Sequence, residues 1–370
     1  MLGWNIQSDQ GGAVAILVAI SAVVLLSFAA LVVDIGYGVV VKNQLHDIAD
    51  AASLAGTRQL GRIYTALPSY AAQQTYVLTA GDRAAIEAEV QDIANKNTAG
   101  GISITIDTAD IKIGQWDLKK RTLTVTDNQP DAVEVTARRD GTANGPIATF
   151  LAGLMGINTL SVTSTSTRNG GPEAPTAALT GISEVGPGEI DVPVGIADQW
   201  FKNKEAFCDQ NIQFYPTNSE TGCAGWTAFD LSPANANTLS KDILQEMPPF
   251  GNYQAPGATA GVTQFEFIGG NVASALPDLK ALYEANRRPD ASSPTGWAWE
   301  TLVIVYQSTS CSNPSGAVTI VGFSSVTIYN VLAPPDGQLI EGKVKCDVYE
   351  EARGGGAEFG TKGSIPGLVR

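Results

Sequence analysis

Side chains that could do chemistry are few in this chain, and their spacing fits no common catalytic arrangement. His46 is the single histidine among 370 residues, so neither a histidine-based triad nor a multi-histidine metal site can be built. The stretch around Ser183, GISEVG, lacks the second glycine of a nucleophile elbow, and GGGAEFGTKG lacks the Ser or Thr that follows the lysine of a phosphate-binding loop. We therefore predict no catalytic residue, no metal site and no cofactor, and we expect that the protein is not an enzyme.

Two acidic positions need separate interpretations. Glu350 and Glu351 are adjacent at the end of a strand-like run, so their side chains point to opposite faces and we expect a solvated charge pair. Asp34 follows directly on the uncharged run 11–33. It is either a carboxylate in the lipid headgroup region or a recognition site for a partner membrane protein, since an unpaired charge inside a membrane costs at least about 2.5 kcal/mol.

The four cysteines, Cys208, Cys223, Cys311 and Cys346, all lie in the second half of the chain and form no C-x-x-C motif. In an oxidising compartment we expect them to form disulfides, and four buried free thiols are the alternative. Three connectivities are open. We favour local closure, Cys208 with Cys223 and Cys311 with Cys346, because a closed loop of about 15 residues contributes roughly 3 kcal/mol.

The element that positions Asp34 is the apolar segment 13–33. At about 1.5 Å of rise per residue it forms a rod of roughly 31 Å, which matches the hydrocarbon core of a bilayer. Its polar residues are Ser21 and Ser27, whose hydroxyls can bond to carbonyls one turn earlier. A cleaved signal peptide and a buried core helix are the alternatives. The first ten residues contain no Lys or Arg, which disfavours a signal peptide, so we predict a retained transmembrane helix.

Charge and size together indicate where the rest of the chain lies. The net charge is −14, which disfavours nucleic acid and anionic lipid headgroups as partners. Long domains translocate largely regardless of charge. We therefore place residues 1–12 in the cytoplasm as a short N-terminus and the bulk of the chain in the periplasm or at the cell surface of a bacterium, anchored to the cytoplasmic membrane by a single span.

Residues 34–168 form the first predicted unit, an α+β module. The transmembrane helix continues into an alanine-rich helix whose small face holds the helix-packing candidates Ala49, Ala52 and Ala55. This face packs either on a sheet of its own domain or on a helix of a neighbouring subunit, which would make a homo-oligomer. A second helix begins near Asp82. Alternating apolar residues between positions 102 and 135 predict an antiparallel sheet with one buried face.

The module closes with a helix predicted over 145–156, in which Ile147, Phe150, Leu151 and Leu154 make the apolar stripe, and a last strand ending at Arg168. Residues 169–176, NGGPEAPT, read as a linker. The second unit, 177–351, reads as a β-rich α+β domain with disulfides. Its tryptophans form either a core or a ligand platform: Trp226, Trp297 and Trp299. The glycine-rich end, 352–370, is predicted to be a loose tail, with an added edge strand as the alternative.

Two stretches resemble a known family. The run 11–60, in which an apolar helix ends in Val-Asp-Ile-Gly and enters an alanine-rich helix, resembles the N-terminal module of TadG-like proteins of the Tad (Flp) pilus-assembly system. DAVEVTARR followed by GPIATFLAGLMGINTLSVTSTSTR is similar to later parts of the same module. The likeness covers roughly residues 11–168. The chain lacks the basic residues that commonly precede this helix and the DxSxS motif of a von Willebrand A-like domain.

The resemblance implies a membrane-anchored, non-enzymatic envelope protein that contributes to Tad pilus assembly or structure. Its partners would be the lipid bilayer through residues 13–33 and other pilus-assembly or envelope proteins, with no nucleic acid. A carbohydrate- or ligand-binding adhesion module, displayed on a membrane stalk, is the alternative function.

Overall fold

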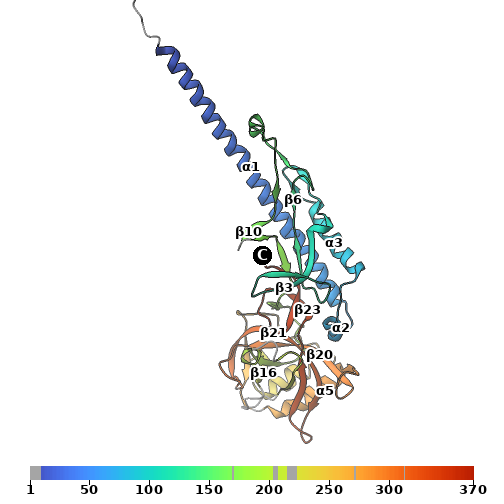
Figure 1. Ribbon diagram of the computed structural model, residues 1–370. Coiled ribbons are helices and arrows are strands. Elements are labelled where there is room, and N and C mark those ends of the chain that lie inside the picture. Colours follow the sequence, from blue (N-terminus) through green and yellow to red (C-terminus); the bar gives the residue numbers. More distant parts are fainter. Residues whose placement is uncertain (1–9, 169–170, 203–206, 215–222, 271, 312) are drawn as a thin grey trace, which may run out of the picture.

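The longest element of the structure, a computed structural model that describes residues 10–168, 171–202, 207–214, 223–270, 272–311 and 313–370, is helix α1 (Gln10–Thr65). It has 56 residues and runs out from one end of the folded part of the chain (Figure 1). Its N-terminal half exposes large apolar side chains, such as Leu17 and Leu25, each 69% exposed. As predicted, one helix has the length and apolar composition to cross a membrane and continues into the alanine-rich segment. Residues 1–9 of the predicted cytoplasmic segment lie outside the described residues.

The C-terminal half of α1 packs on α3 (Ala80–Asn95) and on a five-stranded antiparallel sheet. Ile113, Val133 and Val135 are fully buried in the core between these elements, so the alternating pattern predicted the sheet correctly. The strands follow one another across the sheet in this order: β25 (Gly367–Leu368), β12 (Thr176–Ala178), β5 (Ala132–Val135), β3 (Ile111–Asp117) and β4 (Thr122–Val125).

The helix predicted over 145–156 is wrong. Residues 147–160 instead form a hairpin, in which β7 (Ile147–Ala148) pairs with β8 (Thr159–Leu160) around the 3-10 turn η2 (Ala152–Met155). The predicted stripe does not share one buried face, because Ile147 is 3% exposed and Phe150 is 67% exposed. Short pairings surround this hairpin: β1 (Thr98–Ala99) with β2 (Ile102–Ser103), β6 (Arg138–Arg139) with β9 (Val162–Thr163), and β10 (Ser166–Arg168) with β11 (Gly171–Glu173).

The second unit is built around a sheet that closes on itself, because β20 pairs with both β14 and β21. The stretch 274–288, whose leucines recur at helical spacing, contains α5 (Leu276–Asn286), which buries Leu279 and Leu282. The stretch 238–247 contains the π-helix Thr238–Leu244. The eight strands, in sheet order, are the following: β15 (Asn211–Phe214), β22 (Leu339–Val344), β21 (Gly316–Leu332), β18 (Gln264–Ile268), β16 (Ala224–Phe229), β14 (Val194–Ala197), β20 (Trp297–Tyr306) and β19 (Arg288–Pro289).

Both disulfides are present, but the local pairing that we favoured is wrong. Cys208 is bonded to Cys346, and Cys223 is bonded to Cys311. The first pairing follows the sheet, because Cys208 precedes β15, Cys346 follows β22, and these two strands are antiparallel neighbours. Proximity in the sheet therefore outweighs proximity in sequence.

The C-terminal segment is not a loose tail, so that prediction is wrong. β24 (Thr361–Ile365) pairs in parallel with β23 (Val348–Arg353) and packs against α1, and β25 forms the edge of the five-stranded sheet. β23 also joins β13 (Glu184–Val185) and β17 (Ala258–Thr259). The segment predicted as a linker leads through β11 into β12, which pairs with β5. β12 and β25, which both follow residue 168, thus complete the sheet of the first module.

Candidate functional site

Asp34 lies at the end of the apolar part of α1 and is 6% exposed. Its carboxylate accepts hydrogen bonds from three successive backbone N–H groups of the hairpin 147–160: Phe150 at 2.7 Å, Leu151 at 3.0 Å and Ala152 at 2.6 Å. We considered lipid headgroups or another membrane protein as the partner of Asp34. In the structure its partner is a hairpin of the same chain.

This arrangement stabilises the charged form of Asp34. Burial alone would raise the pKa of the carboxyl, but the three N–H donors outweigh burial and hold the pKa below its usual value. The same bonds explain why residues 150–152 are not helical as predicted, since their N–H groups are bound by a side chain from another element. Asp34 therefore fastens the hairpin to α1 at the point where the apolar segment ends.

Farther along α1, the small-residue face packs within the chain. Ala49 and Ala52 are fully buried, while Ala55 is half-buried. A side chain at Gly56 would meet Val90 of α3, because a Cβ built there lies 2.7 Å from a Val90 methyl. Of the two arrangements considered for this face, the structure shows the one in which the helix packs on its own domain.

Two strands that follow residue 168, β12 and β24, also approach α1 closely. The Thr57 hydroxyl donates to the Ala177 carbonyl of β12 at 3.2 Å, and Arg58 donates to the Ser364 hydroxyl of β24 at 3.1 Å. At Gly61 a built Cβ would lie 2.2 Å from the Ser364 carbonyl oxygen. Only glycine therefore fits at this crossing of α1 and β24.

A short helix, α2 (Tyr70–Gln74), joins the membrane-proximal module to the second unit. Gln73 is 4% exposed and binds the backbone of Tyr349 in β23 twice. Its amide donates to the Tyr349 carbonyl at 3.1 Å, and its side-chain oxygen accepts from the Tyr349 N–H at 2.8 Å. The amide also donates to the Tyr64 carbonyl at 3.1 Å. This one side chain ties α1, α2 and β23 together.

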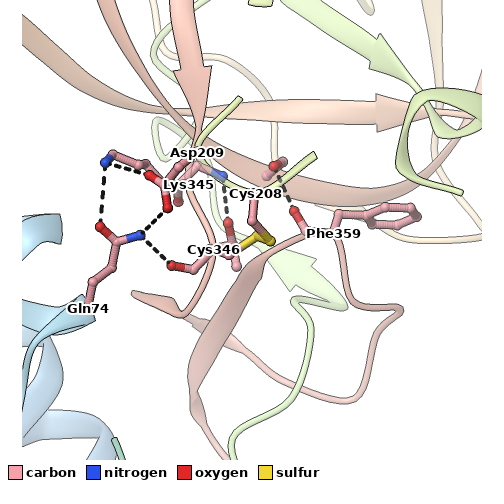
Figure 2. The surroundings of a disulfide bond; sticks show 9 residues. Gln74, Cys208, Asp209, Lys345, Cys346 and Phe359 are labelled. Carbon is pink, nitrogen blue, oxygen red and sulfur yellow. Dashed lines mark hydrogen bonds and ion pairs between the residues drawn. A yellow bond between two sulfur atoms is a disulfide. The ribbon is translucent and has the colours of Figure 1, made fainter. Parts of the chain in front are cut away.

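Gln74 extends the joint to a disulfide, as Figure 2 shows. Its amide donates to the Cys346 carbonyl at 2.8 Å. Lys345 forms an ion pair with Asp209 at 2.9 Å and donates to the Gln74 side-chain oxygen at 3.4 Å. Because Cys208 precedes Asp209 and is bonded to Cys346, the disulfide holds both segments that contact Gln74. We call α2 together with these partners the interdomain joint.

Glu350 belongs to the same joint and corrects our expectation of a solvated charge pair. Its carboxylate accepts hydrogen bonds from the Tyr70 hydroxyl and, at 2.9 Å, from the Ser325 hydroxyl. Burial raises the pKa of Glu350 above its usual value, although both hydroxyls favour the charged form. Glu351 is exposed. The two side chains lie on opposite faces, as the strand geometry requires, but only one of them is solvated.

A buried ion pair completes the contact between the units. Lys362 of β24 and Asp131 are 7% and 4% exposed and form a salt bridge. Burial alone would lower the pKa of Lys362, but Asp131 outweighs it and the pKa lies above its usual value. Beside this pair the rings of Tyr64 and Tyr349 stack with centroids 3.7 Å apart. Charge and aromatic contacts thus hold β23 and β24 to the first module.

The remaining residues singled out in the sequence are not brought together. His46 lies half-exposed on α1. Trp226 and Trp299 are buried, whereas Trp297 is 39% exposed with the Arg287 guanidinium 4.7 Å from its ring. Within the described residues, no three His, Cys, Asp or Glu side chains lie close enough to hold a metal ion.

Sequence reasoning missed the interdomain joint. One signal was available, since Ser69 before YAAQQ has the character of a helix N-cap, and its hydroxyl accepts from the Ala72 N–H. Nothing local indicates the partners of Gln73 and Gln74, which lie more than 270 positions away in β23 and at Cys346.

Comparison with known proteins agrees with this architecture. Residues 12–74 match the family model described as Flp pilus-assembly TadE/G-like, and residues 70–167 match the model described as Tad-like Flp pilus-assembly. No curated protein and no solved structure matches the chain. The first match ends at the last residue of α2, and the second covers α3 and the strands up to β10. Residues 12–167 therefore carry the TadE/G-like and Tad-like domains of Flp pilus-assembly proteins.

Proposed function

We propose that this protein is a membrane-anchored, non-enzymatic scaffold of Tad pilus assembly. In this proposal residues 13–33 span the cytoplasmic membrane, and the module 34–168 supports the β-rich domain 177–351 at a fixed height. Other pilus or envelope proteins bind this scaffold. The observation that carries the proposal is the continuity of α1, because the helix that enters the membrane also forms the core of the folded module.

Rigidity along α1 supports this role. Val41 and Leu45 are already fully buried in the module, two to three turns after Asp34, so no flexible linker separates membrane and domain. At about 1.5 Å per residue, the part of α1 beyond Val33 extends roughly 48 Å from the bilayer. The interdomain joint then fixes the second unit to this rod. This arrangement keeps the second unit at a fixed position relative to the membrane, which suits a protein that acts through contacts with other proteins.

The two disulfides support a location of the folded part outside the cytoplasm. Disulfides persist in oxidising compartments and are rare where thiols are kept reduced. The folded part of the chain follows α1, and long domains translocate largely regardless of charge, which supports a single-pass anchor whose bulk is exported. We therefore place the module and the second unit in the periplasm or at the cell surface.

The proposal is tested by breaking α1 between the membrane and the module. Val40 is 52% exposed, and a proline inside a helix removes a hydrogen bond and kinks the axis at a cost of about 3 kcal/mol. Val40→Pro is expected to stay in the membrane fraction with both disulfides formed, yet to abolish surface pili. Val40→Ala, the matched control, is expected to keep pili.

Two results would contradict the proposal at different levels. Normal pili in a strain that lacks this protein would contradict a role in assembly. Normal pili with Val40→Pro, and loss of pili on deletion, would keep the role in assembly but contradict support by a rigid helix.

A further inference from the structure

The hairpin 147–160, which we call the membrane-proximal hairpin, exposes an unusual number of large apolar side chains. Phe150 is 67% exposed, Ile157 54%, Leu151 38% and Leu160 37%. Figure 1 shows the hairpin rising from the folded module beside α1, toward the N-terminal end of that helix. An apolar surface of this kind at the tip of a hairpin marks an interaction site.

One side of the hairpin is occupied by α1. The Phe150 ring makes an edge contact with Tyr37, with centroids 5.5 Å apart, and the Leu160 side chain lies where a side chain of Gly38 would be. Ala30, one turn before Asp34 on the same face, is 7% exposed, and η2 lies against α1. The hairpin thus covers the last turn of the apolar segment and leaves its own outer side chains uncovered.

The hairpin is also electrically neutral. Residues 141–167 contain no Asp, Glu, Lys, Arg or His. The charge that contacts its tip, Asp34, is covered by three backbone N–H groups. A segment without charges that lies beside a membrane-spanning helix can enter the lipid interface without placing an ion there.

Several backbone N–H groups at the hairpin tip find acceptors within the chain. Besides the three N–H groups on Asp34, Thr149 donates to the Asn158 carbonyl at 3.1 Å and Ile157 donates to the Ala152 carbonyl at 3.0 Å. Gly156, in the left-handed conformation with φ of 84°, donates to the Gly153 carbonyl. Because lipid offers no hydrogen-bond partners, such internal satisfaction is what a non-helical segment needs at membrane depth.

We propose that the membrane-proximal hairpin is a second membrane contact, whose exposed side chains Phe150, Leu151 and Ile157 insert into the bilayer that α1 crosses. Asp34 is the positioning residue that fastens the hairpin at this depth. Ala30 lies four residues before Asp34, within the apolar segment, so the tip reaches about 6 Å into the bilayer from the end of the span. That depth is typical of interfacial segments, which bury about 5–10 Å.

Spin labels on the full-length protein in phosphatidylcholine vesicles test this contact. All four cysteines lie in disulfides, so an introduced cysteine is the single free thiol. The labelled variants are Phe150→Cys and Ile157→Cys, with Leu25→Cys as the lipid reference. Val262→Cys is the aqueous control, because Val262 is equally apolar and 75% exposed. The measurement compares how strongly molecular oxygen and a water-soluble nickel chelate relax each label.

We expect oxygen to dominate at positions 25, 150 and 157 and the nickel chelate to dominate at 262. Relaxation by the nickel chelate at 150 and 157 that equals that at 262 would overturn the proposal. Protection from both reagents, with broadening between labels, would also overturn it, because a second copy of the chain would then cover the hairpin. Adding Asp34→Ala to Ile157→Cys is expected to raise label mobility at 157 and leave that at 25 unchanged, and no change at 157 would overturn the positioning role of Asp34.

Discussion

Gly61→Ala tests whether the C-terminal segment really packs on the membrane helix. The substitution adds one methyl group to α1 at its crossing with β24. The added Cβ would lie 2.2 Å from the Ser364 carbonyl oxygen and 2.9 Å from the carbonyl carbon. Ordinary contact requires about 3.5 Å. The obstructing atoms belong to the backbone, so no side chain can rotate to make room.

The magnitude follows from two opposing effects. Overpacking of this kind costs about 1–3 kcal/mol, whereas alanine gains about 1 kcal/mol over glycine in a helix. Because the obstructing atoms are backbone atoms, we expect the upper end of the overpacking range and a net loss of about 2 kcal/mol in the free energy of unfolding. Gly81→Ala in α3 is the matched control, because its nearest neighbour is the Thr79 hydroxyl at 3.8 Å. Gly81→Ala therefore keeps the gain in helix stability without a steric collision of the added methyl group.

Thermal unfolding of the full chain in detergent, followed by circular dichroism, measures the difference. At about 2–4 °C per kcal/mol for a domain of this size, the Tm of Gly61→Ala is expected to fall by roughly 4–8 °C, while the Tm of Gly81→Ala stays level or rises. A Tm for Gly61→Ala at or above that of the wild type would refute the crossing of α1 and β24.

Three further predictions concern the second unit and its attachment. Peptide mapping of the non-reduced protein is expected to return the two crosslinks of the observed pairing and neither of the local pairing. Burial raises the pKa of Glu350 in the folded state. The stability that the protonated side chain contributes is therefore fully present below its pKa in the unfolded chain and is lost as pH rises through its pKa in the folded protein. Glu350→Gln should therefore raise the Tm relative to wild type more at pH 8 than at pH 4. Lys362→Met leaves Asp131 buried without its ion-pair partner and is expected to cost about 3–5 kcal/mol in chemical unfolding. Lys343→Met, at a half-buried position of β22, is the control and should change little.

Elements whose pattern is local were predictable from the sequence. Each such pattern reflects the buried face of a single element. Examples are the apolar run, its continuation into the alanine-rich helix, and the strands with period-two alternation. Helix α5 likewise follows from Leu276, Leu279 and Leu282 at helical spacing. Cysteine content and the expected compartment likewise gave the presence of disulfides. None of these inferences requires knowing which distant segment lies on the other side of the buried face.

Features that depend on distant partners were not predictable. The pairing of Cys208 with Cys346 spans 138 residues and depends on the neighbours of β15 and β22. The stretch 145–156 has helical apolar spacing, yet a carboxylate 116 positions earlier binds its N–H groups. The glycine-rich C-terminal segment has the composition of a tail, since glycines carry no apolar pattern of their own. In the structure those glycines permit close approach to α1 and β23.

The position of β24 changes how the family module must be understood in this chain. The matched residues end at 167, but the sheet of that module also contains β12 and β25, and Asp131 in its core is neutralised by Lys362. A fragment that stopped at the matched boundary would lack two strands and leave a buried carboxylate without its cation, a loss comparable to the whole stability of many domains. The second unit is therefore part of what holds the membrane-proximal module together. Coupling of this kind lets a force or a partner on the distal unit act on α1 without passing through a flexible linker.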